Sequence, residues 1–250
     1  MKLVKGWIVG IVLVGFCGWM AAQGMGQKVA MHFQVTPKAG MHMQFETALK
    51  AHLQWRKEQN DPWQWYIMEI INGTDYGDYI IRTDERPWAE MDNYELRFKG
   101  RDHFLSTVGP FIADMQSSLT STNEALSNWP DDLRPRLILV EVFSLNPGKA
   151  EVFWQLVAKA SKAFDGRMGH NSWDTVVVGE GAGGGTAILV LPRENWAGLA
   201  PRQQEMVGYM TEAYGEEEVG KMMQQFSDCL AGMNSMVVAV RPDLSLMGGN

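Results

Sequence analysis

A 108-residue internal repeat constrains this chain more than any other feature of its sequence. Six residues recur at this spacing without a gap, and two of them are tryptophans. Self-similarity at a fixed period indicates repeated structural units, so we expect two copies of one fold unit within 250 residues. The recurring pairs are Gly40 and Gly148, Phe45 and Phe153, Trp65 and Trp173, Gly73 and Gly181, Gly77 and Gly185, and Trp88 and Trp196.

The first copy carries the patterns of four strands and two or three helices. Residues 29–35 alternate apolar and polar side chains, which predicts a strand with one buried face. The segment Asn72-Gly73-Thr74-Asp75-Tyr76-Gly77 separates two runs rich in aromatic and β-branched residues, and its glycines favour a hairpin turn. The predicted strands are residues 29–35, 63–71, 79–83 and 124–129, and the predicted helices are residues 41–57 and one or two helices within 92–122, broken near Gly109-Pro110.

The second copy repeats this order of elements. Trp129-Pro130-Asp131 matches Arg241-Pro242-Asp243 at an offset of 112, which predicts equivalent closing strands and about four additional residues in the second copy's long helix. The predicted strands of this copy are residues 137–145, 173–178, 186–191 and 235–240, and the predicted helices are residues 149–164 and 201–231.

Each copy therefore has the order β-α-β-β-α-β, which is that of a ferredoxin-like unit with an antiparallel sheet and helices on one face. We expect an α+β protein with a first repeat at residues 28–133 and a second repeat at residues 135–243. The face of each sheet that lacks helices must be shielded from water. Two sheets of one chain provide this shielding by packing against each other.

This pattern resembles the dimeric α+β barrel superfamily, which includes NIPSNAP-like and antibiotic-biosynthesis-monooxygenase-like domains. The resemblance covers roughly residues 28–243 and rests on the repeat order, on Pro37 and Gly40 with their counterparts Pro147 and Gly148, and on the tryptophan-hairpin-tryptophan pattern. It implies a barrel lumen between the two sheets, which relatives use for small aromatic compounds or for haem. These motifs define topology rather than chemistry, so they predict the fold and not the function.

The chain begins with the features of a secretory signal peptide. Lys2 and Lys5 form a basic start, residues 7–19 are apolar, and small residues follow at positions 21, 22 and 24. We therefore expect a signal peptide at residues 1–24 and a mature protein that is periplasmic or secreted.

Two alternatives to a cleaved leader stay open at this stage. The apolar run of about 13 residues is shorter than the ~20 residues that a membrane-spanning anchor needs. A lipoprotein would use Cys17, but Phe16 occupies a position that normally holds a small residue. Both features favour the cleaved signal peptide.

The charge of the mature chain restricts its partners. Loss of the leader removes two of 22 basic residues, so 20 basic residues face 29 acidic ones and the net charge is −9. Such a surface repels nucleic-acid phosphates and anionic lipids, so we expect neither nucleic-acid binding nor membrane binding after leader removal. Cys229 would be the sole cysteine and cannot form an internal disulfide. The oligomeric state stays open, because one chain supplies both sheets.

The sequence carries no strong metal or cofactor motif, and no catalytic residue is identified. It lacks H-E-x-x-H and C-x-x-C, so no metal and no cofactor are expected. Residues 179–184 fit G-x-G-x-x-G but precede a predicted strand rather than a helix, which favours a hairpin turn. The spacing of His42 and Glu46 and the run Met41-His42-Met43 are the weaker metal-binding alternatives.

Two candidate ligand-binding residues lie on the first predicted strand. His32 and Gln34 fall on the face opposite the apolar residues, so they point into the lumen if the apolar face meets the helices. The second copy has Val140 and Val142 at these positions, so a polar site would be one-sided. His52 on the first helix has Ala160 as its counterpart and is interpreted as a core residue with a functional alternative.

Three further candidates come from the hairpins. Glu69 shares a strand face with Trp65 and is a candidate lumen carboxylate with a raised pKa. Trp65 and Trp173 are candidates for stacking on an aromatic ligand, although repeated tryptophans more often form a shared core. The predicted ligand-binding residues are therefore His32, Gln34, Trp65, Glu69 and Trp173.

The leading functional hypothesis is an exported barrel protein that binds a small apolar or aromatic molecule in its lumen without strong catalysis. The alternative, implied by the resemblance, is a cofactor-independent or haem-linked monooxygenase. Haem-degrading relatives combine a first-strand asparagine with a tryptophan and a histidine, and the first strand here lacks that asparagine. A third hypothesis is a partner-binding module whose lumen is filled by side chains.

Overall fold

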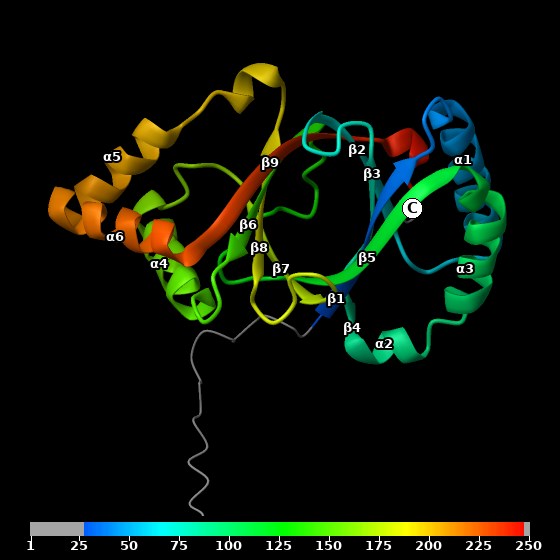
Figure 1. Cartoon of the computed structure of the whole chain (residues 1–250), viewed down its shortest axis with the longest axis horizontal. Helices are drawn as coiled ribbons and strands as arrows, with labels where there is room; N and C mark the ends of the chain where they lie inside the picture. The colour runs from blue at the N-terminus through cyan, green and yellow to red at the C-terminus, as the bar shows by residue number, and fades with distance from the viewer. Residues whose placement is uncertain (1–27, 248–250) are drawn as a thin grey trace, which may run out of the picture.

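The computed structural model describes residues 28–247, and its centre is a closed antiparallel barrel of eight strands (Figure 1). The strands follow the order β3-β2-β9-β6-β8-β7-β5-β1, and β1 pairs back to β3. The barrel strands are β1 (Lys28–Pro37), β2 (Trp65–Gly73), β3 (Tyr79–Thr83), β5 (Ile112–Thr122), β6 (Leu137–Leu145), β7 (Ser172–Val178), β8 (Thr186–Arg193) and β9 (Leu230–Val240), and β4 (Arg86–Pro87) is a short strand beside β1.

The barrel consists of two four-stranded sheets with the same strand order. The first sheet is β5-β1-β3-β2 and the second is β9-β6-β8-β7. In chain order, the second strand of each sheet pairs with the fourth strand of the other sheet. These pairs are β2 with β9 and β7 with β5. The α+β barrel expected from the sequence is therefore confirmed, and a single chain closes it.

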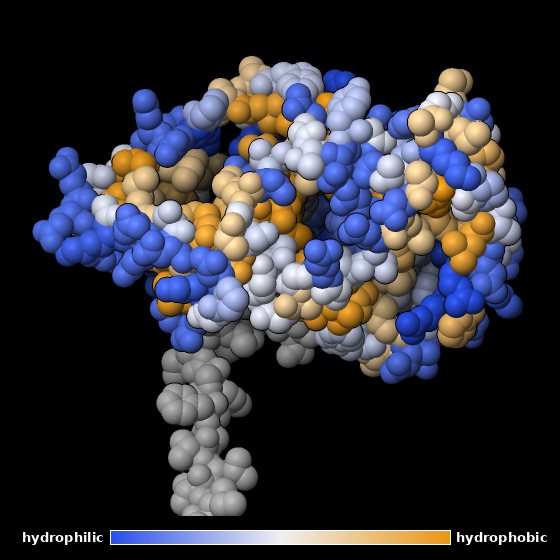
Figure 2. Space-filling view, in the orientation of Figure 1, coloured by the Kyte–Doolittle hydropathy of each residue, from blue (hydrophilic) through white to orange (hydrophobic). Residues whose placement is uncertain are grey.

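The helices cover the outside of the barrel at two opposite ends (Figure 1). Each sheet consequently has one helix-facing side and one side that faces the lumen. On the face drawn in Figure 2, hydrophilic residues gather at the end formed by α5 and α6. The helices are α1 (His42–Glu58), α2 (Trp88–Asp92), α3 (Leu96–Thr107), α4 (Ala150–Phe164), α5 (Gln203–Tyr214) and α6 (Glu216–Cys229), and the short 3-10 helices are η1 (Gly109–Phe111), η2 (Trp196–Leu199) and η3 (Pro242–Leu244).

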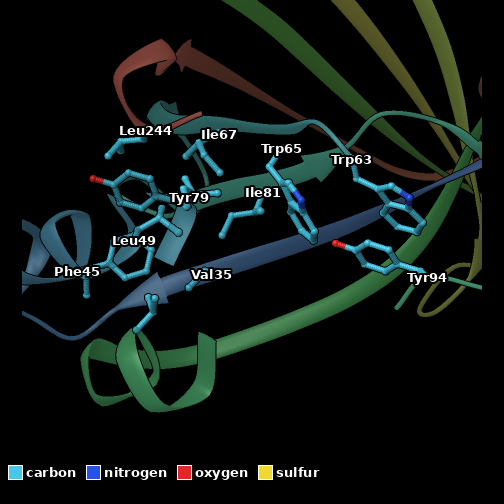
Figure 3. Packing of buried hydrophobic residues seen from close by; sticks show 13 residues of the cluster. Val35, Phe45, Leu49, Trp63, Trp65, Ile67, Tyr79, Ile81, Tyr94 and Leu244 are labelled. Carbon is cyan, nitrogen blue, oxygen red and sulfur yellow. The ribbon is translucent and has the colours of Figure 1, made fainter. Parts of the chain in front are cut away.

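Three apolar clusters hold these layers together. One lies between the first sheet and α1 and α3 (Figure 3), one lies between the second sheet and its helices, and one lies inside the barrel. Phe45 and Phe153 are both fully buried, and Trp65 and Trp173 are 5% and 9% exposed. The repeated aromatic residues therefore fill equivalent helix-facing positions, because each copy packs its helices on its own sheet in the same way.

The predicted closing strand of the first copy at residues 124–129 is wrong. The closing strand is β5, which lies within the segment predicted as helix, and residues 124–129 form the connection to β6. Five consecutive residues of β5, at positions 113–117, are exposed and mostly polar, so this strand lacks an apolar pattern. Its conformation comes from backbone pairing with β1 and β7.

The alignment of the two closing strands at an offset of 112 is wrong for the same reason. β9 ends at Val240, directly before the Arg241-Pro242-Asp243 segment, whereas β5 ends at Thr122, well before Pro130. The helix predicted at residues 201–231 is two helices that meet at Gly215, whose φ of +79° interrupts the first. The G-x-G-x-x-G segment is the turn between β7 and β8, as predicted.

The two sheets join at the pairs β2–β9 and β5–β7, which we call the seams. Glycine allows the strands to approach each other closely at both seams. A Cβ atom on Gly73 would lie 2.6 Å from the Ser235 carbonyl oxygen, where β2 meets β9. A Cβ atom on Gly179 would lie 2.8 Å from Cβ of Ser118, where the turn after β7 meets β5. Both glycines also have positive φ, so both the conformation and the space favour a residue without a side chain.

The predicted signal peptide at residues 1–24 lies outside the described residues. Among residues 28–247, no helix is long and apolar enough to cross a membrane.

We predict that Gly73→Ala lowers the free energy of unfolding by about 2–3 kcal/mol, because it combines a positive φ with a close backbone contact at the seam. Gly148→Ala is the matched control: its φ is +76°, but no atom lies within 4 Å of the added carbon, so we expect a loss of about 1 kcal/mol. Urea denaturation measures both. Equal losses would contradict the role assigned to the seam.

Candidate functional site

The strongest candidate site is a pocket of about 380 Å³ between the first sheet and α2, which we name the α2 pocket. Strands β1 and β5 supply its inner wall, and α2 and the start of α3 supply its outer wall. Aromatic rings and thioethers make up much of the lining, as is usual for small-molecule sites. The lining residues are Met31, Trp63, Trp88, Ala89, Met91, Asp92, Tyr94, Arg97 and Leu119.

Two stacked rings form the fixed part of this pocket. The rings of Trp63 and Tyr94 are nearly parallel, with centroids 3.8 Å apart and an interplanar angle of 7°. Both side chains are buried, and they lie side by side at one end of the first core cluster (Figure 3). A polar hollow of about 490 Å³, lined by residues such as Asn60 and Glu95, borders the same two rings. The stack is therefore a common wall of two hollows.

A buried arginine holds Tyr94 in this position. Nη1 of Arg56 donates hydrogen bonds to Oδ2 of Asp61 and to the Tyr94 hydroxyl, both at 2.7 Å. The Tyr94 hydroxyl donates to the same Asp61 oxygen at 2.8 Å. The Arg56 and Asp61 side chains are only 6% and 0% exposed, so this ion pair is removed from solvent. We call these three residues with Trp65 and His52 the Arg56 network.

Asp61 connects the network to Trp63 and to Trp65, the first residue of β2. Oδ2 of Asp61 accepts from the Trp65 indole Nε1 at 3.0 Å, and Oδ1 accepts from the Trp63 backbone N–H at 3.0 Å. The Arg56 guanidinium also lies over the Trp65 ring, 4.1 Å from its centroid. A buried carboxylate needs such a full set of donors to offset its desolvation.

Gly100 gives the arginine its space. A Cβ atom at this position of α3 would lie 2.5 Å from Nη2 of Arg56. A glycine on α3 therefore allows that helix to pack directly against the guanidinium.

The network extends to two histidines with defined tautomers. Nε of Arg56 donates to Nε2 of His52 at 2.7 Å, so Nδ1 of His52 carries the proton. That Nδ1 lies 3.0 Å from Nδ1 of His103, which must accept. Burial, together with Arg56, lowers the pKa of His52 to about 3 and lowers the pKa of His103. Both rings are therefore neutral at pH 7.

The electrostatics of the pocket wall favour hydrogen bonding over proton transfer. Burial, opposed in part by Arg56, raises the pKa of the Tyr94 hydroxyl, so this group stays protonated. Asp92 and Arg97 add one carboxylate and one guanidinium to the lining, and neither forms an ion pair within residues 28–247. The α2 pocket is thus an aromatic cavity whose lining includes one carboxylate and one guanidinium.

Two of the sequence-predicted site residues face the lumen as expected. Residues of β1 that pack on the helices are Met31, Phe33 and Val35, so His32 and Gln34 point to the opposite side. His32 is paired in register with Arg82, and Nε2 of Gln34 donates to Asp78 at 3.1 Å. The counterpart residues Val140 and Val142 belong to the lumen cluster, as the predicted one-sided polarity requires.

The predicted grouping of Trp65, Glu69 and Trp173 with His32 is wrong, because all three face helices. Trp65 belongs to the Arg56 network. Oε2 of Glu69 pairs with Nη1 of Arg241 at 2.7 Å, and Trp173 packs among the aromatic residues of the second helical layer. A strand with apolar residues on both faces does not reveal from sequence which face meets the helices.

No pattern in the sequence predicts the roles of Trp63, Tyr94 and Arg97 or the ion pair of Arg56 with Asp61. Asp61 stands in the segment Asn60-Asp61-Pro62, whose pattern indicates only the end of a helix. The available signal was His52, a polar residue on an apolar helix stripe. It is 2% exposed and marks the position where the network enters the core.

Comparisons with known proteins identify the fold class. No family model and no curated protein match the sequence. Among solved structures, a proposed monooxygenase from Fusobacterium nucleatum is similar with a TM-score of 0.56, 9% identity, and coverage of 89% of this chain and 95% of that chain. An anthrone oxidase-like protein has a TM-score of 0.55, 11% identity, and coverage of 89% and 94%.

A mutant chlorite dismutase from Candidatus Nitrospira defluvii is also similar, with a TM-score of 0.51, 10% identity, and coverage of 86% and 91%. These matches extend over nearly all of each chain. The protein therefore has the dimeric α+β barrel fold of the chlorite dismutase and monooxygenase-like structures. At such low identity the likeness establishes the fold alone.

We predict that Asp61→Ala lowers the free energy of unfolding by about 3–5 kcal/mol, because it leaves the Arg56 charge buried without a partner. Asp102→Ala, which removes an exposed pair with Arg101, is the control, with an expected loss of at most about 1 kcal/mol. Urea denaturation at pH 7 distinguishes them. Similar losses in the two variants would contradict the contribution of the Arg56–Asp61 ion pair to stability.

We predict that stability decreases as the pH falls from about 6.5 to 4.5. Burial, aided by Arg82, lowers the pKa of His32 from 6.5 to about 4, and that of His52 is lowered to about 3. The unfolded chain therefore binds protons in this window that the folded chain does not, and His32 alone accounts for at most about 3 kcal/mol. Glu46 and Asp243, whose pKa values are also lowered, act only below about pH 4.5.

Urea denaturation series at pH 7, 6 and 5 measure this slope. A His32→Val variant is expected to have a smaller slope than the wild type. A stability that is constant from pH 7 to 5 would show that neither histidine is held neutral by the fold.

Proposed function

We propose that the protein binds a small planar aromatic molecule in the α2 pocket. This proposal keeps the ligand class inferred from the sequence and moves its site from the lumen to the space beside α2. The observation that carries it is a pocket of about 380 Å³ whose wall is the fixed stack of Trp63 and Tyr94. Trp63 and Tyr94 are 3% and 8% exposed, so they form an ordered wall that a ligand contacts with little loss of conformational entropy.

The rim of the pocket supports the same ligand class. Trp88 is 41% exposed and lines the pocket from α2, which leaves part of its indole accessible to a ligand. Met31, Met91 and Leu119 add flexible apolar surface that adapts to the outline of a ring system. Arg97 provides a charged contact for an acidic or phenolic substituent.

The Tyr94 hydroxyl does not supply the base that an oxygenase reaction would need. A cofactor-independent oxygenase must remove a proton from its substrate, which requires a base at the pocket. The Tyr94 hydroxyl accepts from Arg56, donates to Asp61 and has a raised pKa, so it is held as a neutral structural group. An oxygenase reaction in this pocket would therefore depend on Asp92, the carboxylate of the lining, as its base.

A haem-linked reaction does not fit the residues of this pocket. No histidine, cysteine or lysine is among the residues that line it. Both ring nitrogens of the nearby His52 are engaged by Arg56 and His103, so His52 has no lone pair directed at the pocket. The described residues around the α2 pocket thus offer iron no imidazole or thiolate ligand, and the Tyr94 hydroxyl is already engaged by Arg56 and Asp61.

We predict that Trp88→Ala weakens binding of the probe 2-naphthol at least about tenfold, a loss of roughly 1.4 kcal/mol. Trp196→Ala is the matched control, because Trp196 is the repeat counterpart of Trp88, is 57% exposed and lies in the second copy. Isothermal titration calorimetry measures both dissociation constants. Equal affinities in the two variants, or an absence of saturable binding to the wild type, would refute the proposed function.

We also propose that the protein acts outside the cytoplasm after removal of residues 1–24. The support is the basic, apolar and small-residue order at the start of the chain. N-terminal sequencing of protein from the periplasm or medium is expected to begin near residue 25. A chain that still begins at Met1 would contradict this expectation.

A further inference from the structure

The barrel lumen contains a second group of side chains that the α2 pocket does not use. One wall is polar and comes from the first sheet: His32 of β1 is paired in register with Arg82 of β3 and with Ser118 of β5. Thr120 of β5 lies two residues from Ser118 on the same face, opposite Ala30. These four polar side chains therefore converge on one region of the lumen.

Two of these groups lack the hydrogen bonds that buried polar atoms require. Thr120 is 1% exposed, and its Oγ1 has no hydrogen-bond partner in the described part of the chain. Within residues 28–247, neither ring nitrogen of His32 takes part in a hydrogen bond or an ion pair, although burial lowers the pKa of this histidine to about 4. A neutral imidazole offers one donor and one acceptor, and both are available to a molecule in the lumen. These groups can therefore form hydrogen bonds with a molecule bound in the lumen.

The opposite wall is aliphatic and comes mainly from the second copy. Val142, Ile188 and Val190 belong to the lumen cluster, together with Met68 and Met236 of the adjoining strands. These side chains are only partly buried, although they point into a closed barrel. His32 likewise keeps some accessible surface. Both walls of the lumen thus keep accessible surface.

Arg82, a cationic group of the lumen, is already paired with two carboxylates. Arg82 lies 3.4 Å from Asp174 of the second copy and 3.4 Å from Glu85. Asp174 also accepts hydrogen bonds from Thr122 and Ser172. An additional anion would therefore find no free positive charge here, and burying any unpaired ion in the barrel would be unfavourable. An uncharged molecule with a hydrogen-bonding end and a hydrocarbon body matches both walls.

We propose that the barrel lumen is a second binding site, independent of the α2 pocket, for a small uncharged amphiphile such as an aliphatic alcohol or amide. Its polar end hydrogen-bonds to His32 and Thr120, and its hydrocarbon part packs against Val142, Ile188 and Met236. The divergence of the two copies creates the site, because His32 and Gln34 stand where the second copy has Val140 and Val142.

Binding of butan-1-ol tests this proposal, with butyrate and butylammonium as charged probes of equal length. Methyl and imidazole NMR signals of the full mature chain report occupancy of the lumen. We expect saturable shifts of the Ile188, Met236 and His32 signals with butan-1-ol, and at least tenfold weaker binding of both ions. Shifts that do not saturate, or equal binding of the three probes, would overturn the proposal.

Three variants locate the site. His32→Val places the counterpart residue of the second copy in the first, and Thr120→Val removes only the hydroxyl. Each is expected to weaken butan-1-ol binding at least fivefold, while His170→Val, a change at an exposed histidine outside the barrel, leaves it unchanged. Undiminished binding in both lumen variants would overturn the proposal. Unchanged 2-naphthol binding in these variants would separate this site from the α2 pocket.

Discussion

The buried ion pair of Arg56 with Asp61 is the interaction on which the first copy depends. Removing two charges from water is costly, and here the cost is offset by hydrogen bonds from Tyr94, Trp65 and Trp63 and by stacking on an indole ring. These contacts join the end of α1, the start of β2 and the segment before α3. The same interaction that fixes the helices therefore also fixes the wall of the α2 pocket.

The two copies share one fold but differ in the side chains that surround their equivalent tryptophans. Equivalent phenylalanines and tryptophans pack helices on each sheet, but the second copy surrounds Trp173 with Phe143, Phe153 and Trp154 instead of an ionic network. The difference is visible at His52, whose counterpart is Ala160. Inside the barrel the same divergence gives one polar and one aliphatic wall. Polar chemistry is thus concentrated in the first copy.

Sequence reasoning predicted the barrel because the repeat and the alternating patterns report local geometry. It failed at β5, whose exposed polar residues carry no strand pattern and depend on pairing with β1, a contact that a local window does not contain. It placed His32 and Gln34 correctly, because only one face of β1 is apolar throughout. It misplaced Trp65 and Glu69, since β2 is apolar on both faces, and it missed Tyr94, whose role depends on residues that are distant in sequence.

The central claim is that an aromatic ligand lies between α2 and the first sheet, in contact with the rings fixed by Arg56. Intermolecular nuclear Overhauser effects between 2-naphthol and the protein test this most directly. The account predicts contacts from the ligand protons to the indole protons of Trp88 and Trp63 and to the methyl group of Met31. Contacts to Trp196, or to the lumen methyl groups of Val142 and Ile188 instead, would contradict it.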